Sequence, residues 1–445
     1  MVQQAPKKLK RFAFRNCAGG TPADKKEILR QALQVAVALE FSTIPPYLVA
    51  LYSLKDKTSS AYQIIRSVAL EEMLHINLAC NLMNAIADPK DEEGTRPKFH
   101  GEVHIDKLVV DSDDKTLNLP IAYPDEESLR PILNGPRVQL MAASTELMRQ
   151  TFMGIEQPLP ETNDKLGDEK EFDSIGQFYQ AIEQLFIDIC EGDACPNQDT
   201  LFTGDPNWQR TDFYFGSGGG KPIKVTDLET AQEAIKQIMQ QGEGAIPPNT
   251  GYDKSQPYGT YNQYGLRSDG TYGPILGTPY ELSHYFKFKA IADGIVPLPS
   301  VYPMIPSPSQ EKFESAGNED AKKLNDIFNH SYSLLIYTLQ EIFSGDKEEG
   351  EEKYFSTVVH LMQIVLPSFA TQLMKMPMYP DGDATLGPTA GPSFEYKEKP
   401  GNGYLAAIGE AINHALISSL SSSTKATLEV VKKAICDIVE FQEAS

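Results

Sequence analysis

The chain has 445 residues, of which 41% are hydrophobic and 23% charged, as in an ordinary globular protein with a large core. Sixty-one acidic against forty basic residues leave a net charge of −21, which argues against nucleic-acid or anionic-membrane partners, because these need clustered Lys and Arg. No secretion signal stands at the N-terminus and no uncharged apolar run is long enough to span a membrane, so a soluble, cytoplasmic protein is expected.

The N-terminal part is expected to fold as two long helices after an irregular arm over residues 1–22. Apolar spacing predicts a first helix from Ala23 to about Leu54 and a second from about Ser59 to Ala87. Pro45 and Pro46 interrupt the first helix but should kink it rather than end it, since the apolar spacing resumes after them.

The middle of the chain combines one β-like segment with helices and long loops. Residues 98–122 predict a β-hairpin packed on the helices. Thr226 and Glu229 form a capping-box pattern at the start of one of four predicted helices, at about 134–154, 174–190, 226–241 and 279–294. Two stretches rich in Gly, Pro, Asn and Tyr, 192–222 and 244–279, are expected to be functional lids or binding loops, with plain surface insertions as the alternative.

The C-terminal part is expected to be helical throughout. A proline-rich segment near residue 305 predicts a boundary between one domain over 23–305 and a helical region over 306–445. The predicted helices of this region lie near 319–344, 353–376, 403–418 and 422–441. Altogether the sequence predicts a mostly α protein with long loop insertions and a small β element.

The strongest chemical signal is a Glu-x-x-His motif that occurs twice. The first copy is Glu72 and His75, and the second is Glu281 and His284. Residues three apart share one face of a helix, so both side chains of a pair can reach one point. A carboxylate with a neutral imidazole suits iron, manganese or zinc.

These residues are expected to face the core, where an unpaired carboxylate is costly. Glu72 and His75 fall within the apolar stripe of the second helix, and Glu40 falls within that of the first. Glu281 and His284 share a face with apolar residues of their own predicted helix. A shared metal site compensates all these buried groups at once, as in four-helix bundles with one Glu from each of two helices and Glu-x-x-His from the other two.

The sequence offers two candidates for the Glu of the remaining helix. Glu243 precedes Glu281 by 38 residues, close to the 32 residues that separate Glu40 from Glu72. Its rival Glu183 lies 98 residues before Glu281. The preferred ligand set is therefore Glu40, Glu72, His75, Glu243, Glu281 and His284, with Glu183 as the alternative to Glu243.

Several of these stretches together resemble a known family. They are ALEFSTIPPYLVALYSL (38–54), SVALEEMLHINLACNLMNAI (67–86), IKQIMQQGEG (235–244), ELSHYFKFKAI (281–291) and GPSFEY (391–396). They look like the ferritin-like enzymes of the iminophenyl-pyruvate dimer synthase type, which are associated with bacterial pigment and indolocarbazole pathways. The resemblance implies a ferritin-like di-metal bundle and oxidative work on an amino-acid-derived imine, with the six residues above in the ligand positions.

The functional prediction is a di-iron oxidase or oxygenase of secondary metabolism that acts on a small organic substrate with O₂. Two iron ions are expected, with manganese as the alternative metal. In this scheme Glu72 and Glu281 bridge the metals, while Glu40 and Glu243 are terminal ligands. The alternatives are a ferroxidase that handles iron without an organic substrate, and a partner protein with a vestigial site. Catalytic residues beyond the ligands, and whether the chain forms a homo-oligomer, stay open.

Overall fold

The computed structural model describes the chain except for several segments, among them those that contain Glu243 and Glu281. The predicted loop over 244–279 lies outside the described residues as well. The described residues are 11–14, 20–110, 113–119, 138–157, 171–172, 174–192, 200–212, 214, 220–242, 282–345, 351–418 and 420–444.

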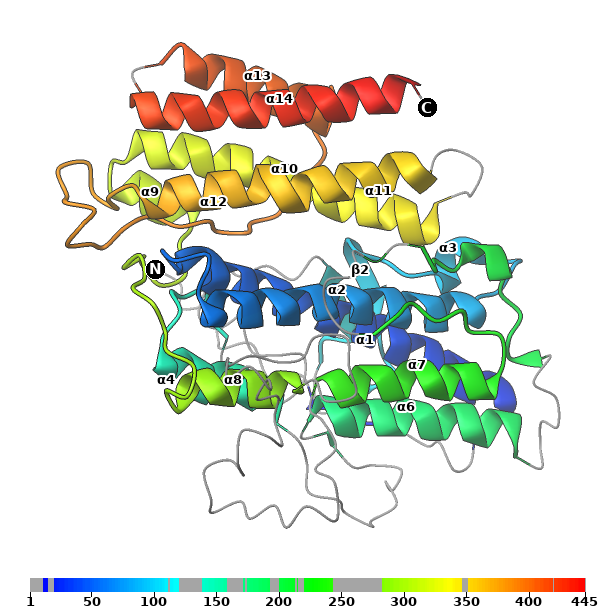
Figure 1. Cartoon of the computed structure of the whole chain (residues 1–445). Coiled ribbons are helices and arrows are strands. Elements are labelled where there is room, and N and C mark those ends of the chain that lie inside the picture. The colour runs from blue at the N-terminus through cyan, green and yellow to red at the C-terminus, as the bar shows by residue number, and fades with distance from the viewer. Residues whose placement is uncertain are drawn as a thin grey trace.

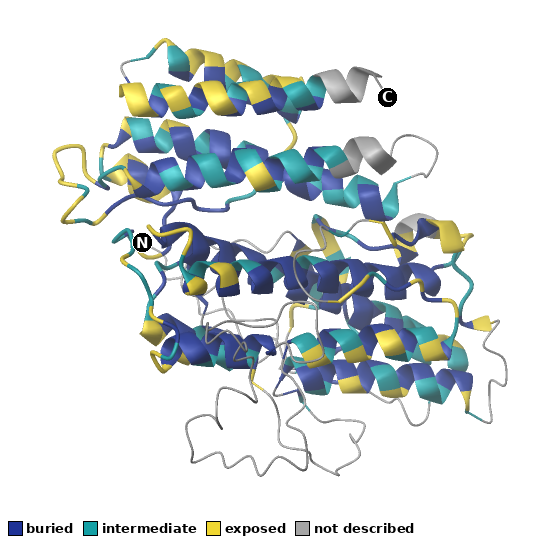
Figure 2. Cartoon of the chain, viewed as in Figure 1, coloured by how far each residue is buried: buried dark blue, intermediate teal, exposed yellow. Residues whose placement is uncertain are grey.

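Two long antiparallel helices form the central layer of the protein. Helix α1 spans Pro22–Ser53 and is started by a capping box between Thr21 and Asp24, and α2 spans Ser60–Ala85. Both helices agree closely with their predicted ranges, and α1 continues through its two internal prolines as expected. Helix α1 is long and apolar enough to cross a membrane, but 94% of its most apolar window is buried inside the protein. Figure 2 shows both helices buried along most of their length.

On one side of this layer, two bundle positions are each filled by shorter helices placed in succession. Helix α7 (Leu228–Gln241) is followed in space by α8 (His284–Ala292), and the Tyr285 amide donates to the Gly242 carbonyl at 3.3 Å where they meet (Figure 1). A short helical stretch, α4 (Thr145–Leu147), η1 (Met148–Phe152) and α5 (Met153–Ile155), packs beside α8. Helix α6 (Ile175–Cys190) packs beside α7 and α1.

Several boundaries in this layer differ from the predicted ones. The predicted helix over 134–154 begins only at Thr145, where Ser144 caps it, and residues 138–143 are not helical. Its η1 segment is a π-helix, in which the Met153 amide bonds to the Met148 carbonyl five residues earlier. The predicted capping box at Thr226 lies one residue too early, since Asp227 and Thr230 form it.

The β structure consists of two small antiparallel pairs. The predicted hairpin is confirmed by β2 (Gly101–His104), which pairs with β4 (Thr116–Leu119) in the register Gly101 to Leu119. Strand β3 (Val109–Val110) lies between them in sequence but pairs with β1 (Arg11–Phe12) in the expected N-terminal arm.

The C-terminal helices cover the opposite side of the α1–α2 layer, at the top of Figure 1. The longest of them, α10 (Glu319–Ser344), has the predicted bounds. The predicted helix over 353–376 is a succession of α11 (Glu351–His360), the π-helix η5 (Leu361–Val365) and α12 (Leu366–Met374). Helices α13 (Tyr404–Leu416) and α14 (Ser422–Ala444) form the outer pair, and α9 (Gln310–Ser315) was not predicted.

Candidate metal centre

Helix α1 contributes one carboxylate and two hydroxyl groups to a buried polar cluster inside the bundle. Glu40, Thr43 and Tyr47 lie about one turn apart on one face of α1, because residues three and four positions apart share a helix face. Glu40 is 3% exposed and Tyr47 is 0% exposed. A carboxylate buried to this degree is costly unless a cation or strong hydrogen bonds compensate its charge.

Helix α2 adds Glu72 and His75 from its own buried face. The two side chains lie one turn apart and are 2% and 1% exposed. The Thr43 hydroxyl of α1 donates to Glu72 Oε2 at 3.0 Å, which ties the two helices together at this level.

The Glu72 carboxylate lies between two histidine rings. Its Oε1 is 2.8 Å from Nδ1 of His284, the first residue of α8, and its Oε2 is 3.7 Å from Nδ1 of His75. The two imidazoles are nearly parallel, with ring centroids 5.3 Å apart and an angle of 25° between the planes. One nitrogen or oxygen atom of each of these three residues lies within 4.8 Å of the others. Glu72 therefore joins the two histidines in one buried group that could hold a metal ion.

The other nitrogen of each ring is held by a separate acceptor. His75 Nε2 lies 3.1 Å from Oε1 of Gln241 at the end of α7, and His284 Nε2 lies 2.7 Å from Oε2 of Glu71. Lys287 on α8 also contacts the Glu71 carboxylate, at 2.9 and 2.7 Å. With Nε2 as the donor in both rings, each imidazole presents Nδ1 toward the carboxylates, an arrangement typical of metal-bound histidines.

The geometry around the two Nδ1 atoms fits a metal cation. Buried His284 Nδ1 has no well-directed hydrogen bond within the described part of the chain, although Glu72 Oε1 lies close to it. His75 Nδ1 lies 3.5 Å from Glu40 Oε2. A space between a nitrogen lone pair and carboxylate oxygens holds either a proton or a metal ion. These donor types together suit iron, manganese or zinc.

A third carboxylate of the cluster comes from Glu156, which was not predicted. Glu156 ends the short helix α5 and is 3% exposed. Its Oε2 lies 3.7 Å from His284 Nδ1, and its Oε1 accepts a hydrogen bond from the Tyr47 hydroxyl at 2.5 Å. Glu40 is held in the same way by Tyr179 of α6, whose hydroxyl donates to Oε1 at 2.6 Å. Glu40, Glu72 and Glu156 thus place three carboxylates in one buried cluster, where bound cations would compensate the cost of burying their charge.

Burial and mutual contact shift the pKa values of this cluster. Burial raises the pKa of Glu40 to about 7, although its hydrogen bond with His75 acts in the opposite direction. Burial lowers the pKa of His75, but its hydrogen bonds with Glu40 and Glu72 outweigh this effect and raise the pKa to about 10. The pKa of Glu72 is below its usual range in spite of burial, because His284 and His75 favour the charged carboxylate. Without metal, the site therefore binds protons at neutral pH.

The structure brings four of the six predicted ligands together. Glu40, Glu72, His75 and His284 form the cluster, whereas Glu243 and Glu281 lie outside the described residues. The rival Glu183 is half-buried on α6, accepts from Gln232 at 3.1 Å and does not line the cavity at the cluster.

Only part of the second Glu-x-x-His motif lies within the described residues, which resume at Leu282. Helix α8 begins at His284, with Ser283 as its extended N-cap residue, and so starts later than the predicted position near 279. His284 nevertheless reaches the cluster, because the first turn of α8 lies where α7 ends.

The sequence contains only a weak indication that Glu156 belongs to the buried cluster. Met148, Phe152 and Glu156 follow each other at steps of four, which places a carboxylate at the end of an apolar stripe. The number of residues between successive Glu ligands does not point to Glu156, because that comparison assumes helices that run through the site without interruption. The π-helix just before Glu156 also shifts the periodicity by which a helix face is recognised.

Comparisons with known proteins agree with this architecture. A family model described as Ferritin-like matches residues 33–293. Dichlorochromopyrrolate synthase from Lentzea aerocolonigenes is 24% identical over 453 residues, covering 86% of this chain and 37% of that protein. The chain thus spans little more than a third of the length of this relative. A crystal structure of a ferritin-like protein from Caulobacter vibrioides at 1.95 Å resolution matches with a TM-score of 0.48 and 19% identity, over 83% of this chain and 98% of that chain.

Proposed function

The chain belongs to the ferritin-like family, and from that premise we propose that it is a di-iron oxidase or oxygenase of secondary metabolism. Its substrate in this proposal is a small organic molecule, an imine derived from an amino acid. The relative named dichlorochromopyrrolate synthase supports an enzyme of this class. The observation that carries the proposal is the pair of Nδ1 atoms, from His75 and His284, that face the single carboxylate of Glu72.

In the proposed centre, Glu72 would be shared between two metal ions. Glu40 and His75 would hold one of them, and Glu156 and His284 would hold the other. Glu243 and Glu281 stay proposed ligands from the sequence alone. Two iron ions, when bound there, would supply the electrons for reaction with O₂, which carboxylate and imidazole side chains cannot supply.

The surrounding residues orient the ligands and exclude water. Tyr179 and Tyr47 donate to Glu40 and Glu156, and so fix which carboxylate oxygen stays free to face a metal. Gln241 and Glu71 do the same for the two imidazoles. The cavity beside the cluster has a volume of about 10 Å³, which is room for about one water molecule. We expect the substrate to approach along the α6 and α7 wall of this cavity, where Ile175, Gly176, Met239 and Gly242 lie.

The first test is the metal content of the full-length protein after anaerobic reconstitution with ferrous iron. Elemental analysis should find about two iron ions per chain in the natural protein and a large loss in Glu72→Ala. Glu183→Ala is the matched control, since this variant removes a half-buried carboxylate outside the cluster and should keep both ions. An absence of bound metal, or equal loss in both variants, would refute the di-metal centre.

The second test separates the oxidase from the predicted alternative of iron handling. Oxygen uptake by the iron-loaded protein is measured with and without imines derived from amino acids. Uptake that continues over many turnovers only with an imine supports the proposal. Uptake that depends on ferrous iron alone and stops when the iron is oxidised would indicate a ferroxidase.

A further inference from the structure

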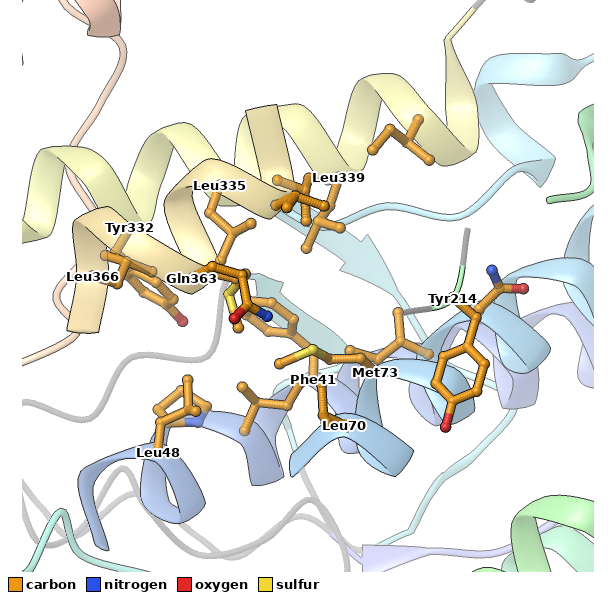
Figure 3. Close-up of a pocket in the computed structure, with 18 of the residues that line it drawn as sticks. Phe41, Leu48, Leu70, Met73, Tyr214, Tyr332, Leu335, Leu339, Gln363 and Leu366 are labelled. Carbon is orange, nitrogen blue, oxygen red and sulfur yellow. The ribbon is translucent and has the colours of Figure 1, made fainter. Parts of the chain in front are cut away.

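A second cavity lies on the side of the α1–α2 layer that faces away from the candidate metal centre. It lies between α1 and α2 on one side and α10, α11, η5 and α12 on the other (Figure 3). Its volume is about 110 Å³. Its lining is almost wholly apolar and includes Phe41, Leu48, Met73, Leu335, Leu339 and Leu366.

One side chain that lines this cavity has a polar group without a hydrogen-bond partner among the described residues. The Tyr332 hydroxyl of α10 is buried and forms no hydrogen bond with any described residue, and the whole side chain is only 2% exposed. Leaving such a donor unsatisfied costs free energy that a phenylalanine would avoid. The ring itself is held firmly, stacked on Phe41 at 6.2 Å and edge-on to Phe394 at 5.0 Å. The hydroxyl is therefore held in apolar surroundings, and no acceptor for it lies among the residues that the structure describes.

The part of the wall that η5 forms, on the same side as Tyr332, is adaptable and has an irregular backbone. Met362 and Gln363 belong to the π-helix η5, which precedes Pro367. A proline lacks the amide that would continue the regular hydrogen bonding, and π-helical turns are frequent at functional sites. Gln363 is exposed and marks the rim by which the cavity reaches solvent. Met73 and Met362 have flexible, polarizable side chains that adjust to a ring placed between them.

We propose that this cavity binds one six-membered aromatic ring that carries a single hydrogen-bond acceptor, with the Tyr332 hydroxyl as its donor. The volume supports a single ring, since an apolar cavity of about 150 Å³ in another protein accepts benzene. A flexible alkyl chain would leave the hydroxyl unsatisfied, whereas a ring oxygen or ring-bound carbonyl would accept from it. This site is separate from the metal centre, because Phe41 and Met73 line the cavity while their neighbours Glu40 and Glu72 point to the other side of the layer.

The test compares phenol with toluene as probes of the full chain by isothermal titration calorimetry. The two rings are alike in size, but phenol alone offers an oxygen to Tyr332. Changing Tyr332→Phe should weaken phenol binding about 3- to 10-fold relative to toluene binding, which is the worth of one net hydrogen bond. Tyr337→Phe, on the same helix but against Tyr404 and Lys399, is the matched control and should change neither affinity.

Two further variants decide whether the rings bind in this cavity. Leu335→Trp fills it from the buried side, and Leu339→Phe does so at a half-buried position that tolerates a larger side chain better. Both probes should lose measurable binding in whichever of these variants keeps the circular dichroism spectrum of the folded protein. Unchanged phenol binding there, an unchanged phenol-to-toluene ratio in Tyr332→Phe, or tighter binding of an alkyl chain without an oxygen, such as pentane, would overturn the proposal. None of these readouts involves the metal, so failure here leaves the proposed oxidase untouched.

Discussion

The buried pair of Lys287 and Glu71 gives the sharpest prediction about stability. Lys287 is 0% exposed and Glu71 is 1% exposed, and the ammonium contacts both carboxylate oxygens at 2.9 and 2.7 Å. Changing Lys287→Met keeps most of the side-chain volume but leaves the Glu71 carboxylate without its ammonium partner. Removing one member of a buried ion pair costs about 3–5 kcal/mol, because the other charge stays buried and uncompensated.

A matched control lies two residues further along the same helix. Lys289 bonds to Asp293 at 2.6 Å, but these side chains are 16% and 22% exposed, so water and salt screen the pair. Pairs of this kind contribute about 0–1 kcal/mol, and Lys289→Met should therefore cost far less than Lys287→Met. The double variant Glu71→Gln with Lys287→Met removes both charges and keeps an acceptor for His284, so it should recover most of the loss.

Urea unfolding of the metal-free proteins, followed by circular dichroism, measures these differences. Metal affinity is a second readout, since the groups that hold a ligand histidine typically affect metal affinity by about 10- to 100-fold when changed. If Lys287→Met is no less stable than Lys289→Met, or if the double variant loses as much as the single one, the reasoning from the buried pair is wrong.

Two further predictions concern the metal centre. Tyr179→Phe removes the hydrogen bond to Glu40, so the pKa of Glu40 should rise above about 7. The affinity for Mn²⁺, measured by titration, should then fall about tenfold. Tyr52→Phe, on the helix α1 that carries Glu40, is the control and should leave the Mn²⁺ affinity unchanged. Because the pKa of His75 is raised to about 10, its proton must leave when metal binds. Calorimetry in buffers of different ionisation enthalpy should therefore detect proton release at pH 7 and a metal affinity that increases with pH. A metal affinity independent of pH would contradict the protonation of the empty site.

Regular helices with clear caps were predictable from the sequence. The bounds of α10 and nearly those of α2 followed from apolar spacing, because both helices run without interruption and bury one continuous face. The same reasoning placed Glu40, Glu72 and His75 in one buried cluster. Such arguments depend on the helical period alone, which holds wherever the backbone is regular.

The prediction failed where the backbone is irregular or where contacts are distant in sequence. Glu156 follows a π-helix and reaches His284 across 128 positions of sequence, which no local pattern reveals. The buried ion pair of Glu71 with Lys287 was not predicted either, since it joins residues 216 positions apart in the sequence. The orphan hydroxyl of Tyr332 depends on packing between two regions of the chain and has no counterpart in any motif.

The junction between α7 and α8 also bears on how such a protein can diversify. In a continuous helix each inserted residue turns everything beyond it by about 100°, which would move a ligand off its face. Where Gly242 and Tyr285 meet, the two helix ends contact each other directly through the hydrogen bond from the Tyr285 amide to the Gly242 carbonyl. Doubling the length of a connecting segment costs only about 0.6 kcal/mol in closure entropy. Insertions at this point can therefore change in length and composition while His284 keeps its place, so new substrate contacts can evolve beside an unaltered cluster of ligands.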